Sequence, residues 1–109
     1  MTERSKKYLS DILISIEFIE DFIADIKTFP DYQRDTKTKS AVERQLGIIG
    51  EAVNKYRQEG NQDLTQTQQI IQFRNRLIHA YDSVDDSIVW AIISNHLPKL
   101  KYEVMILLD

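Results

Sequence analysis

The sequence contains no cysteine, only two prolines and three glycines, and no long uninterrupted hydrophobic run. The absence of cysteine excludes a disulfide framework and any metal site built from thiolates. A chain that does not depend on disulfides is typical of a reducing compartment, so we expect a cytoplasmic protein.

The apolar-looking segment near the N-terminus, DILISIEFIEDFIADI, follows a group of basic residues, as the apolar region of a signal peptide would. A secretory signal or a membrane span would not carry carboxylates inside that region. Five carboxylates interrupt the segment: Asp11, Glu17, Glu20, Asp21 and Asp25. We therefore expect an amphipathic helix of a soluble protein that has no membrane partner.

An excess of positive charge is also missing. The chain has 14 Lys and Arg against 17 Asp and Glu, for a formal net charge of -3 at pH 7. Such a chain does not hold nucleic acid by a large basic surface, so any nucleic-acid function must rest on a local site. The 109 residues suffice for one domain, residues 1–109, that buries roughly two-thirds of its unfolded surface.

Apolar residues recur at spacings of three and four in four segments, which predicts four amphipathic helices. The expected ranges are about Ser5 to Lys27, Thr38 to Gln58, Thr65 to Ile78, and Ile88 to Leu107. No alternating strand pattern or internal repeat is present. The fold class predicted is all-α, an antiparallel four-helix bundle with short polar connections.

Proline and glycine positions refine this prediction. Pro30 should end the first helix and leave YQRDTKTK as a connection, and Pro98 should kink the last helix. Gly47 and Gly50 lie inside the second helix, where glycine is unfavourable, so they indicate a close contact with another helix. Trp90 and Tyr102 are expected to pack against neighbouring helices rather than to stack on bases.

The stretch RNRLIHAY, residues 74–81, places several polar side chains near the end of the third helix. A structural interpretation is available, because basic residues are favourable near a helix C-terminus. The functional interpretation starts from Arg74 and His79, which diverge by about 140° on an ideal helix. They could converge on one ligand only if the helix unwinds near His79 or a second chain completes the site.

These residue types suit a phosphodiester substrate. Histidine can move a proton near neutral pH, and arginine offers a fixed fork of donors to phosphate oxygens. In RNA, the 2′-hydroxyl can attack the adjacent phosphorus once a base removes its proton, and a guanidinium stabilises the charge that develops. The chemistry requires no metal ion.

Residues 74–81 match the Arg-x-x-x-x-His-x-Tyr signature of HepT-like toxins, which belong to the HEPN superfamily of small all-helical ribonucleases. AVERQLGIIGEAVNKY (41–56) resembles the second helix of that family, SVDDSIVWAIISNHLPKLK (83–101) its last, and YLSDILISIEFIEDFI (8–23) its first. The resemblance therefore covers nearly the whole chain in order.

The resemblance implies a metal-independent endoribonuclease toxin, without cofactors, of a type II or type VII toxin–antitoxin pair. It implies an RNA substrate, a homodimer or higher oligomer that brings two motifs together, and a minimal nucleotidyltransferase as antitoxin. It assigns Arg74 and His79 as catalytic residues, Asn75 as a supporting residue and Tyr81 as the acceptor of AMP from the antitoxin.

Two other functions remain open from the sequence. The chain could be a non-catalytic HEPN module that binds nucleotide or substrate for a partner nucleotidyltransferase, or a bundle that serves only as an assembly scaffold. The intact Arg-x-x-x-x-His spacing favours the enzyme over both. Metal sites are disfavoured, since His79 and His96 share no ligand spacing and the acidic residues that follow Tyr81 are better explained as helix caps.

Overall fold

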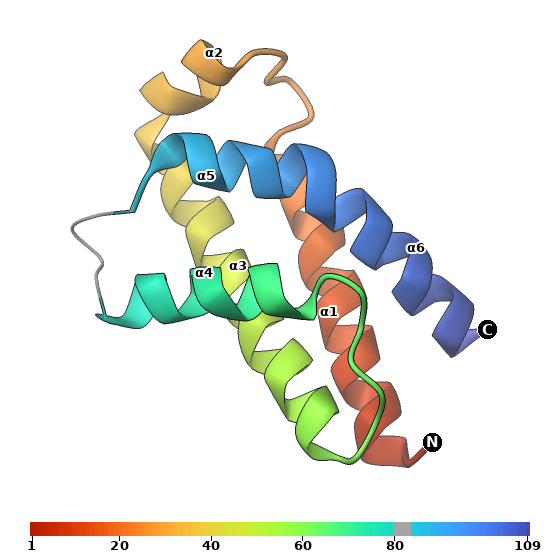
Figure 1. Cartoon of the computed structure of the whole chain (residues 1–109). Coiled ribbons are helices and arrows are strands. Elements are labelled where there is room, and N and C mark those ends of the chain that lie inside the picture. Colours follow the sequence, from red (N-terminus) through yellow and green to blue (C-terminus); the bar gives the residue numbers. More distant parts are fainter. Residues whose placement is uncertain (80–83) are drawn as a thin grey trace.

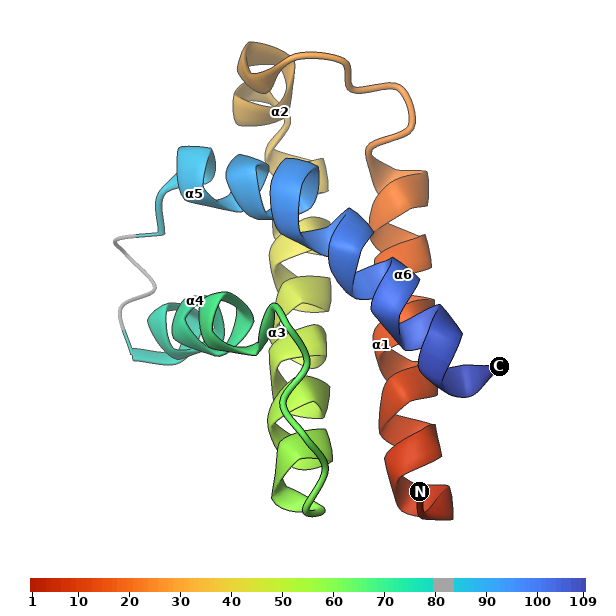
Figure 2. The same cartoon turned by 45° about the vertical axis from the view of Figure 1, so that its right-hand side comes forward.

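The computed structural model describes residues 1–79 and 84–109, and all regular structure within these ranges is helical. The two longest helices, α1 (Glu3–Phe22) and α3 (Thr36–Gln58), lie side by side with opposite chain directions (Figures 1 and 2). Two further helical segments lie across this pair, and a short helix lies beyond the end at which α3 begins. The predicted all-α fold is confirmed.

Side-chain caps set where four of the helices begin. The side chains of Thr2, Thr28, Asp35 and Asp85 each accept a hydrogen bond from a backbone amide in the first turn of the helix that follows. Such bonds satisfy amides that have no partner within the helix. Hydrogen bonds from Thr38 and Ser87 hold the pKa of the Asp35 and Asp85 carboxyls below the usual value. The prediction of Asp85 as a cap is confirmed.

The segment after α1 differs from the prediction. Helix α1 ends at Phe22, before the predicted end near Lys27, and part of the predicted connection forms a short helix, α2 (Phe29–Arg34). Pro30 lies in the first turn of α2, where its missing N–H has no helical partner to lose. Tyr32 of α2 is fully buried, so this segment contributes to the core.

Helix α4 (Thr67–His79) lies across α3 and carries most of the RNRLIHAY stretch (Figures 1 and 2). Its bounds agree closely with the range predicted from the spacing of its apolar residues. Ile70 and Phe73 are buried toward the rest of the bundle, while the end of α4 that carries His79 extends to its edge. The fold therefore places the candidate motif at the periphery.

The last helical segment is continuous but contains a π-helical stretch. It consists of α5 (Asp86–Ala91), the π-helix η2 (Ile92–His96) and α6 (Leu97–Leu108). The first amide of α6 donates to the carbonyl five residues earlier, not four. The change of direction expected from Pro98 occurs around this stretch and is visible in Figure 2.

The core draws on every α-helix of the fold. Its buried apolar side chains are Leu9, Ile12, Ile16, Ile19, Tyr32, Val42, Leu46, Ile49, Ala52, Val53, Tyr56, Leu64, Ile70, Phe73, Val89, Ile92, Ile93, Leu97, Leu100 and Val104. Trp90 packs against Tyr32 and Phe29, with ring centroids 5.3 and 6.4 Å away, as expected. The prediction for Tyr102 is wrong, because its side chain is 70% exposed.

The apolar-looking N-terminal segment forms most of α1, with one face in the core and carboxylates on the other. Over residues 1–79 and 84–109, no helix combines the length and the apolar character needed to cross a lipid bilayer.

Candidate functional site

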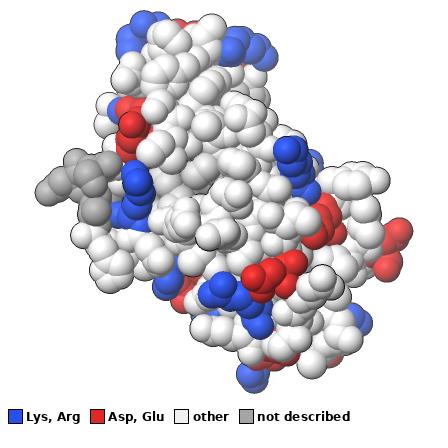
Figure 3. All heavy atoms as spheres, in the orientation of Figure 1, with Lys and Arg blue, Asp and Glu red and all other residues white. Residues whose placement is uncertain are grey.

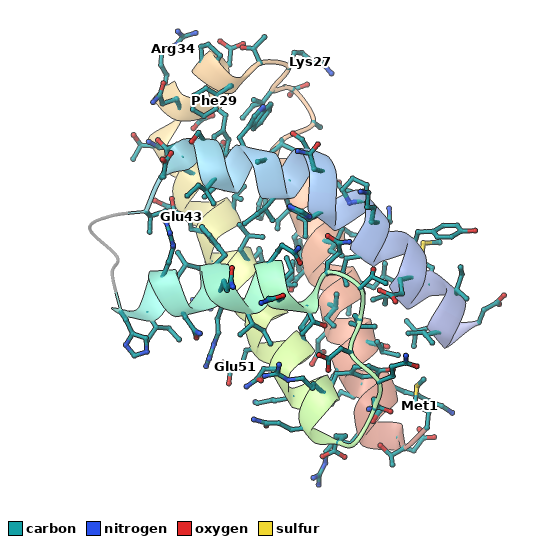
Figure 4. The ribbon with its side chains drawn as sticks, in the orientation of Figure 1. Met1, Lys27, Phe29, Arg34, Glu43 and Glu51 are labelled. Atoms are coloured by element: carbon teal, nitrogen blue, oxygen red, sulfur yellow. The ribbon has the colours of Figure 1, made fainter. Side chains whose placement is uncertain are left out.

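An ion pair holds Arg74 where α4 crosses α3. Arg74 Nη2 donates to Glu51 Oε2 at 2.5 Å, and Nη1 donates a longer bond of 3.3 Å to Asn75 Oδ1. Figure 4 shows Glu51 beside α4. The Arg74 side chain is 23% exposed and that of Glu51 is 44% exposed. Since a guanidinium has five N–H donors, Arg74 is oriented by these contacts and retains donors for a further ligand.

The close approach of the two helices at this point depends on Gly50. A β-carbon built at Gly50 would lie 2.5 Å from Cβ and 2.9 Å from Cγ of Arg74, closer than real carbon atoms pack. Gly47 lies one turn earlier, and a β-carbon there would make only an ordinary contact, 3.8 Å from a methyl carbon of Leu77. The predicted close helix contact is confirmed, and Gly50 is the residue that requires it.

His79 is exposed and is the last residue of α4. Because α4 stays α-helical through His79, the divergence of about 140° from Arg74 persists. Unwinding near His79 was one of the two routes to convergence, and α4 shows none up to His79 itself. One chain leaves Arg74 against α3 and His79 on a different side of α4. Asn75, four residues before His79, shares its face of the helix.

Tyr81, the residue expected to accept AMP, lies outside the described residues. The same holds for Asp82, one of the acidic residues that the sequence analysis explained as helix caps.

One exposed isoleucine follows Arg74 on α4, and another precedes Glu51 on α3. Ile78 is 55% exposed and stands one turn after Arg74 on α4, while Ile48 is 38% exposed and stands three residues before Glu51 on α3. Exposure of an apolar side chain to water is unfavourable. Ile48 and Ile78 therefore give the surfaces of α3 and α4 near Arg74 an exposed apolar part.

The acidic residues near the start of α5 have structural partners. Asp85 caps the helix, and the carboxylate of Asp86 forms a 3.0 Å ion pair with Lys39 of α3. Within the described ranges, no group of three or more His, Asp or Glu side chains is arranged to hold a metal ion. His96, the second histidine, lies instead on η2 with Nδ1 2.6 Å from Oε1 of Gln66.

Glu43 of α3 is a titratable residue near the same end of the bundle (Figure 4). Burial raises the pKa of its carboxyl, and the negative charge of Asp86 adds to this effect, while Lys39 opposes it. The ionised form of Glu43 is therefore less stable in the folded protein than in water.

Sequence reasoning placed Arg74, Asn75 and His79 on one helix but missed Glu51, the partner of Arg74. A signal was present, because Glu51 directly follows Gly50, which was expected at a helix contact. A charged residue beside such a contact is well placed to pair with the facing helix. The sequence did not show which residue of α4 would face it.

Comparison with known proteins identifies relatives of this chain. The family model described as "Ribonuclease HepT-like" matches residues 12–107. A protein of Thermococcus cleftensis named "Probable ribonuclease HepT" is 37% identical over 103 residues, covering 93% of each chain. A protein of Methanocaldococcus jannaschii whose name also describes an RNase is 35% identical over 95 residues, covering 85% of this chain and 78% of its own. The comparison with solved structures gave no match.

Proposed function

This chain belongs to the HepT-like ribonuclease family, and on that premise we propose that it is an endoribonuclease in which Arg74 and His79 cleave RNA. The observation that supports the proposal is the placement of the motif. Arg74 is held in a defined position by Glu51, and His79 is exposed at the end of the same helix. Both groups are accessible to a polyanionic substrate at the edge of the bundle.

The proposed reaction uses groups that the protein and the substrate already carry. His79 removes the proton from a 2′-hydroxyl, whose oxygen then attacks the adjacent phosphorus and displaces the 5′-oxygen of the next nucleotide. The products are a 2′,3′-cyclic phosphate and a 5′-hydroxyl, and the departing oxygen takes up a proton. Arg74 binds a phosphoryl oxygen and stabilises the negative charge that grows there.

The active site in this proposal is shared between two copies of the chain. Arg74 and His79 diverge by about 140° on a regular helix, so Arg74 of one copy and His79 of the other would act together. The exposed Ile78 and Ile48 give this face of α3 and α4 apolar surface that a second copy can bury. A two-fold axis near the end of α4 would bring both motifs into one cleft.

The biological setting proposed is a toxin–antitoxin pair of type II or type VII. A minimal nucleotidyltransferase would act as antitoxin and transfer AMP to Tyr81, two residues after His79 in the sequence. The added phosphate would compete with RNA for the donors of Arg74 and would place bulk near His79. In this scheme the protein works in the cytoplasm, where its RNA substrate and ATP are available.

The catalytic assignment is tested by His79→Ala and Arg74→Ala. Each should lower RNA cleavage by at least about 10²-fold while the helical circular dichroism stays unchanged. Arg57→Ala serves as the control, because Arg57 is an exposed arginine of α3 whose guanidinium, among the described residues, hydrogen-bonds only to Asn54 of its own helix. Full cleavage by either folded motif variant would refute the assignment. Absence of cleavage by the folded wild type would instead favour the non-catalytic nucleotide-binding module.

A mixing experiment tests whether the site is shared. Arg74→Ala and His79→Ala chains, each inactive alone, are unfolded together, refolded and assayed. If each site takes its two groups from different chains, mixed dimers contain one intact site and cleavage returns. If each site lies within one chain, every site in the mixture lacks one group and activity stays absent.

A further inference from the structure

A cavity of about 310 Å³ lies between α4 and the segment formed by α5 and η2, on a different side of α4 from Glu51. Its lining residues are Gln69, Gln72, Phe73, Arg76, Ile88, Ala91, Ile92 and His96. In Figure 3 the surface between α4 and α5 carries few charged atoms, and Lys or Arg atoms lie at its end beside the grey residues. Its volume is at the lower end of the range for small-molecule pockets.

The lining has two chemically distinct parts. The apolar part comes from Phe73 and Ile92, both almost fully buried, together with parts of α5. The polar part comes from two glutamine amides, one guanidinium and one imidazole, and no carboxylate of residues 1–79 and 84–109 lines the cavity. In a chain of net charge -3, a cavity that is lined by Arg76 and by no acidic residue of the described ranges suits a ligand that combines a flat apolar body with negative charge. Asp85, whose pKa the charge of Arg76 helps to lower, lies outside this lining.

The π-helical stretch contributes to the polar part of the lining. His96 is the last residue of η2, and its Nδ1 lies 2.6 Å from Oε1 of Gln66, across on the segment that leads into α4. A carbonyl oxygen can only accept, so Nδ1 donates where it faces Oε1, and Nε2 is left for a contact with a ligand. π-helical turns inside longer helices occur frequently at functional sites.

Two residues that line the cavity lie on the same face of α4 as the candidate catalytic residue His79. Gln72, Arg76 and His79 follow one another at spacings of four and three on α4, so they share one face of that helix. Arg74 belongs to a different face, where it contacts α3. An RNA strand that reaches His79 can therefore extend along α4 toward the cavity without passing the Arg74–Glu51 pair.

We propose that this cavity binds one nucleobase of single-stranded RNA close to the cleaved phosphate, and so determines where the strand is cut. This inference rests on the proposed ribonuclease function. The apolar surface and the Arg76 guanidinium plane offer stacking contacts, and the amides of Gln69 and Gln72 match the adjacent donors and acceptors on a base edge. Arg76 is also placed to pair with the phosphate that joins this base to the strand held at His79.

The first test measures cleavage-site preference by sequencing the products of a randomised RNA. Gln69→Ala should reduce cleavage at the preferred sites and flatten the preference at one position at a fixed distance from the cut. Gln68→Ala is a matched control, because it removes the neighbouring exposed glutamine of the same helix, which does not line the cavity. An unchanged preference in Gln69→Ala, with the wild type clearly selective, would overturn the inference and leave the ribonuclease function standing.

The second test does not require cleavage. AMP, CMP, GMP and UMP are titrated separately into isotope-labelled protein, and backbone amide shifts are followed by nuclear magnetic resonance. Saturable shifts centred on Gln72, Arg76 and Ala91 are expected for at least one nucleotide. They should be lost in Ala91→Leu, whose larger side chain fills the cavity. Absence of any shift at these residues up to millimolar nucleotide would contradict a base-binding cavity, whether or not the protein cleaves RNA.

Nucleotide binding and RNA cleavage can therefore fail independently. Binding at the cavity without any RNA cleavage would support the base site and reject the proposed ribonuclease function. Shifts that leave the cavity unaffected and cluster elsewhere on the bundle would reject the base site.

Discussion

Gly50 of α3 and Arg74 of α4 are in direct contact, and they lie so close that Gly50 could not carry a β-carbon without a clash with Arg74 Cβ. The contact places the backbone of α3 against the first carbons of the arginine side chain. The Arg74 side chain is consequently held at two points: Gly50 packs against its Cβ and Cγ, and Glu51 pairs with its guanidinium.

Gly50→Ala should destabilise the protein by about 1–3 kcal/mol, because α4 must move away from α3. Cleavage should fall as well, since Arg74 moves with α4. Gly47→Ala is the matched control: its β-carbon meets only the end of Leu77, so the helix propensity of alanine should raise stability by roughly 0.5–1 kcal/mol. Urea unfolding of both variants measures the difference, and equal effects would contradict the contact.

Glu51 should act as a positioning residue for Arg74. Glu51→Ala removes the acceptor at Nη2 and should lower cleavage by about tenfold, because the guanidinium loses its orientation. Glu51→Gln keeps an oxygen at this position and should restore most of the activity. Stability should change by less than about 1 kcal/mol in both, since the ion pair is partly exposed. Equal activity in the two variants would show that Glu51 does not position Arg74.

Ile78→Asp should weaken dimerisation and cleavage together while the fold persists, because it places a charge on the face proposed to meet a second copy. Ile106→Asp is the matched control, since Ile106 is 56% exposed on α6 and Ile78 is 55% exposed on α4. Sedimentation velocity and a cleavage assay at the same concentration measure both properties. A monomeric Ile78→Asp protein with full activity would argue against a site shared between chains.

Glu43→Gln should stabilise the protein at pH 7 and lose this advantage in acid. The folded-state pKa of Glu43 is raised above the ordinary 4.5, so wild-type stability falls as pH rises through this range, when the partly buried carboxyl ionises. The glutamine variant cannot ionise and does not lose that stability. Thermal unfolding from pH 4 to pH 8 should show the two curves converge at low pH. A gain of equal size at pH 4 would point to a cause other than ionisation.

Tyr81→Phe should abolish modification by the cognate nucleotidyltransferase, because it removes the acceptor hydroxyl and keeps the ring. Intact-mass spectrometry after incubation with the nucleotidyltransferase and ATP should show mass increases in units of AMP on the wild type and none on the variant. Modified wild type should lose cleavage activity without unfolding. If both proteins are labelled equally, the acceptor is another residue.

The sequence predicted α3 and α4 well because their apolar residues repeat with the helical period, as the agreement of their bounds shows. It failed at Pro30, which was interpreted only as a helix stop. Proline is equally common in the first turn of a helix, and Thr28, whose side chain accepts a bond from the Asp31 amide, supplied the missing start signal. Tyr32 was consequently assigned to a connection although it is a core residue.

Part of the candidate site was also beyond sequence reasoning. Arg74, Asn75 and His79 could be found because they lie in one short stretch. The ion pair of Arg74 with Glu51 and the meeting of His96 with Gln66 join residues far apart in the chain. Such contacts depend on how α4 and α5 cross the α1–α3 pair, and helical periodicity does not determine crossing angles.

Because η2 is a π-helical turn, the orientation of α5 depends on how many residues this stretch contains, as well as on which residues they are. Removing one residue from Ile92–His96 would let the segment revert to a regular α-helix, and α5 would then rotate by about 100° relative to α6. The core side chains of α6 could stay in place while a different face of α5 turned toward α4. Insertion or deletion of a single codon could thus replace the wall opposite Gln72 and Arg76 without changing any residue of the catalytic motif.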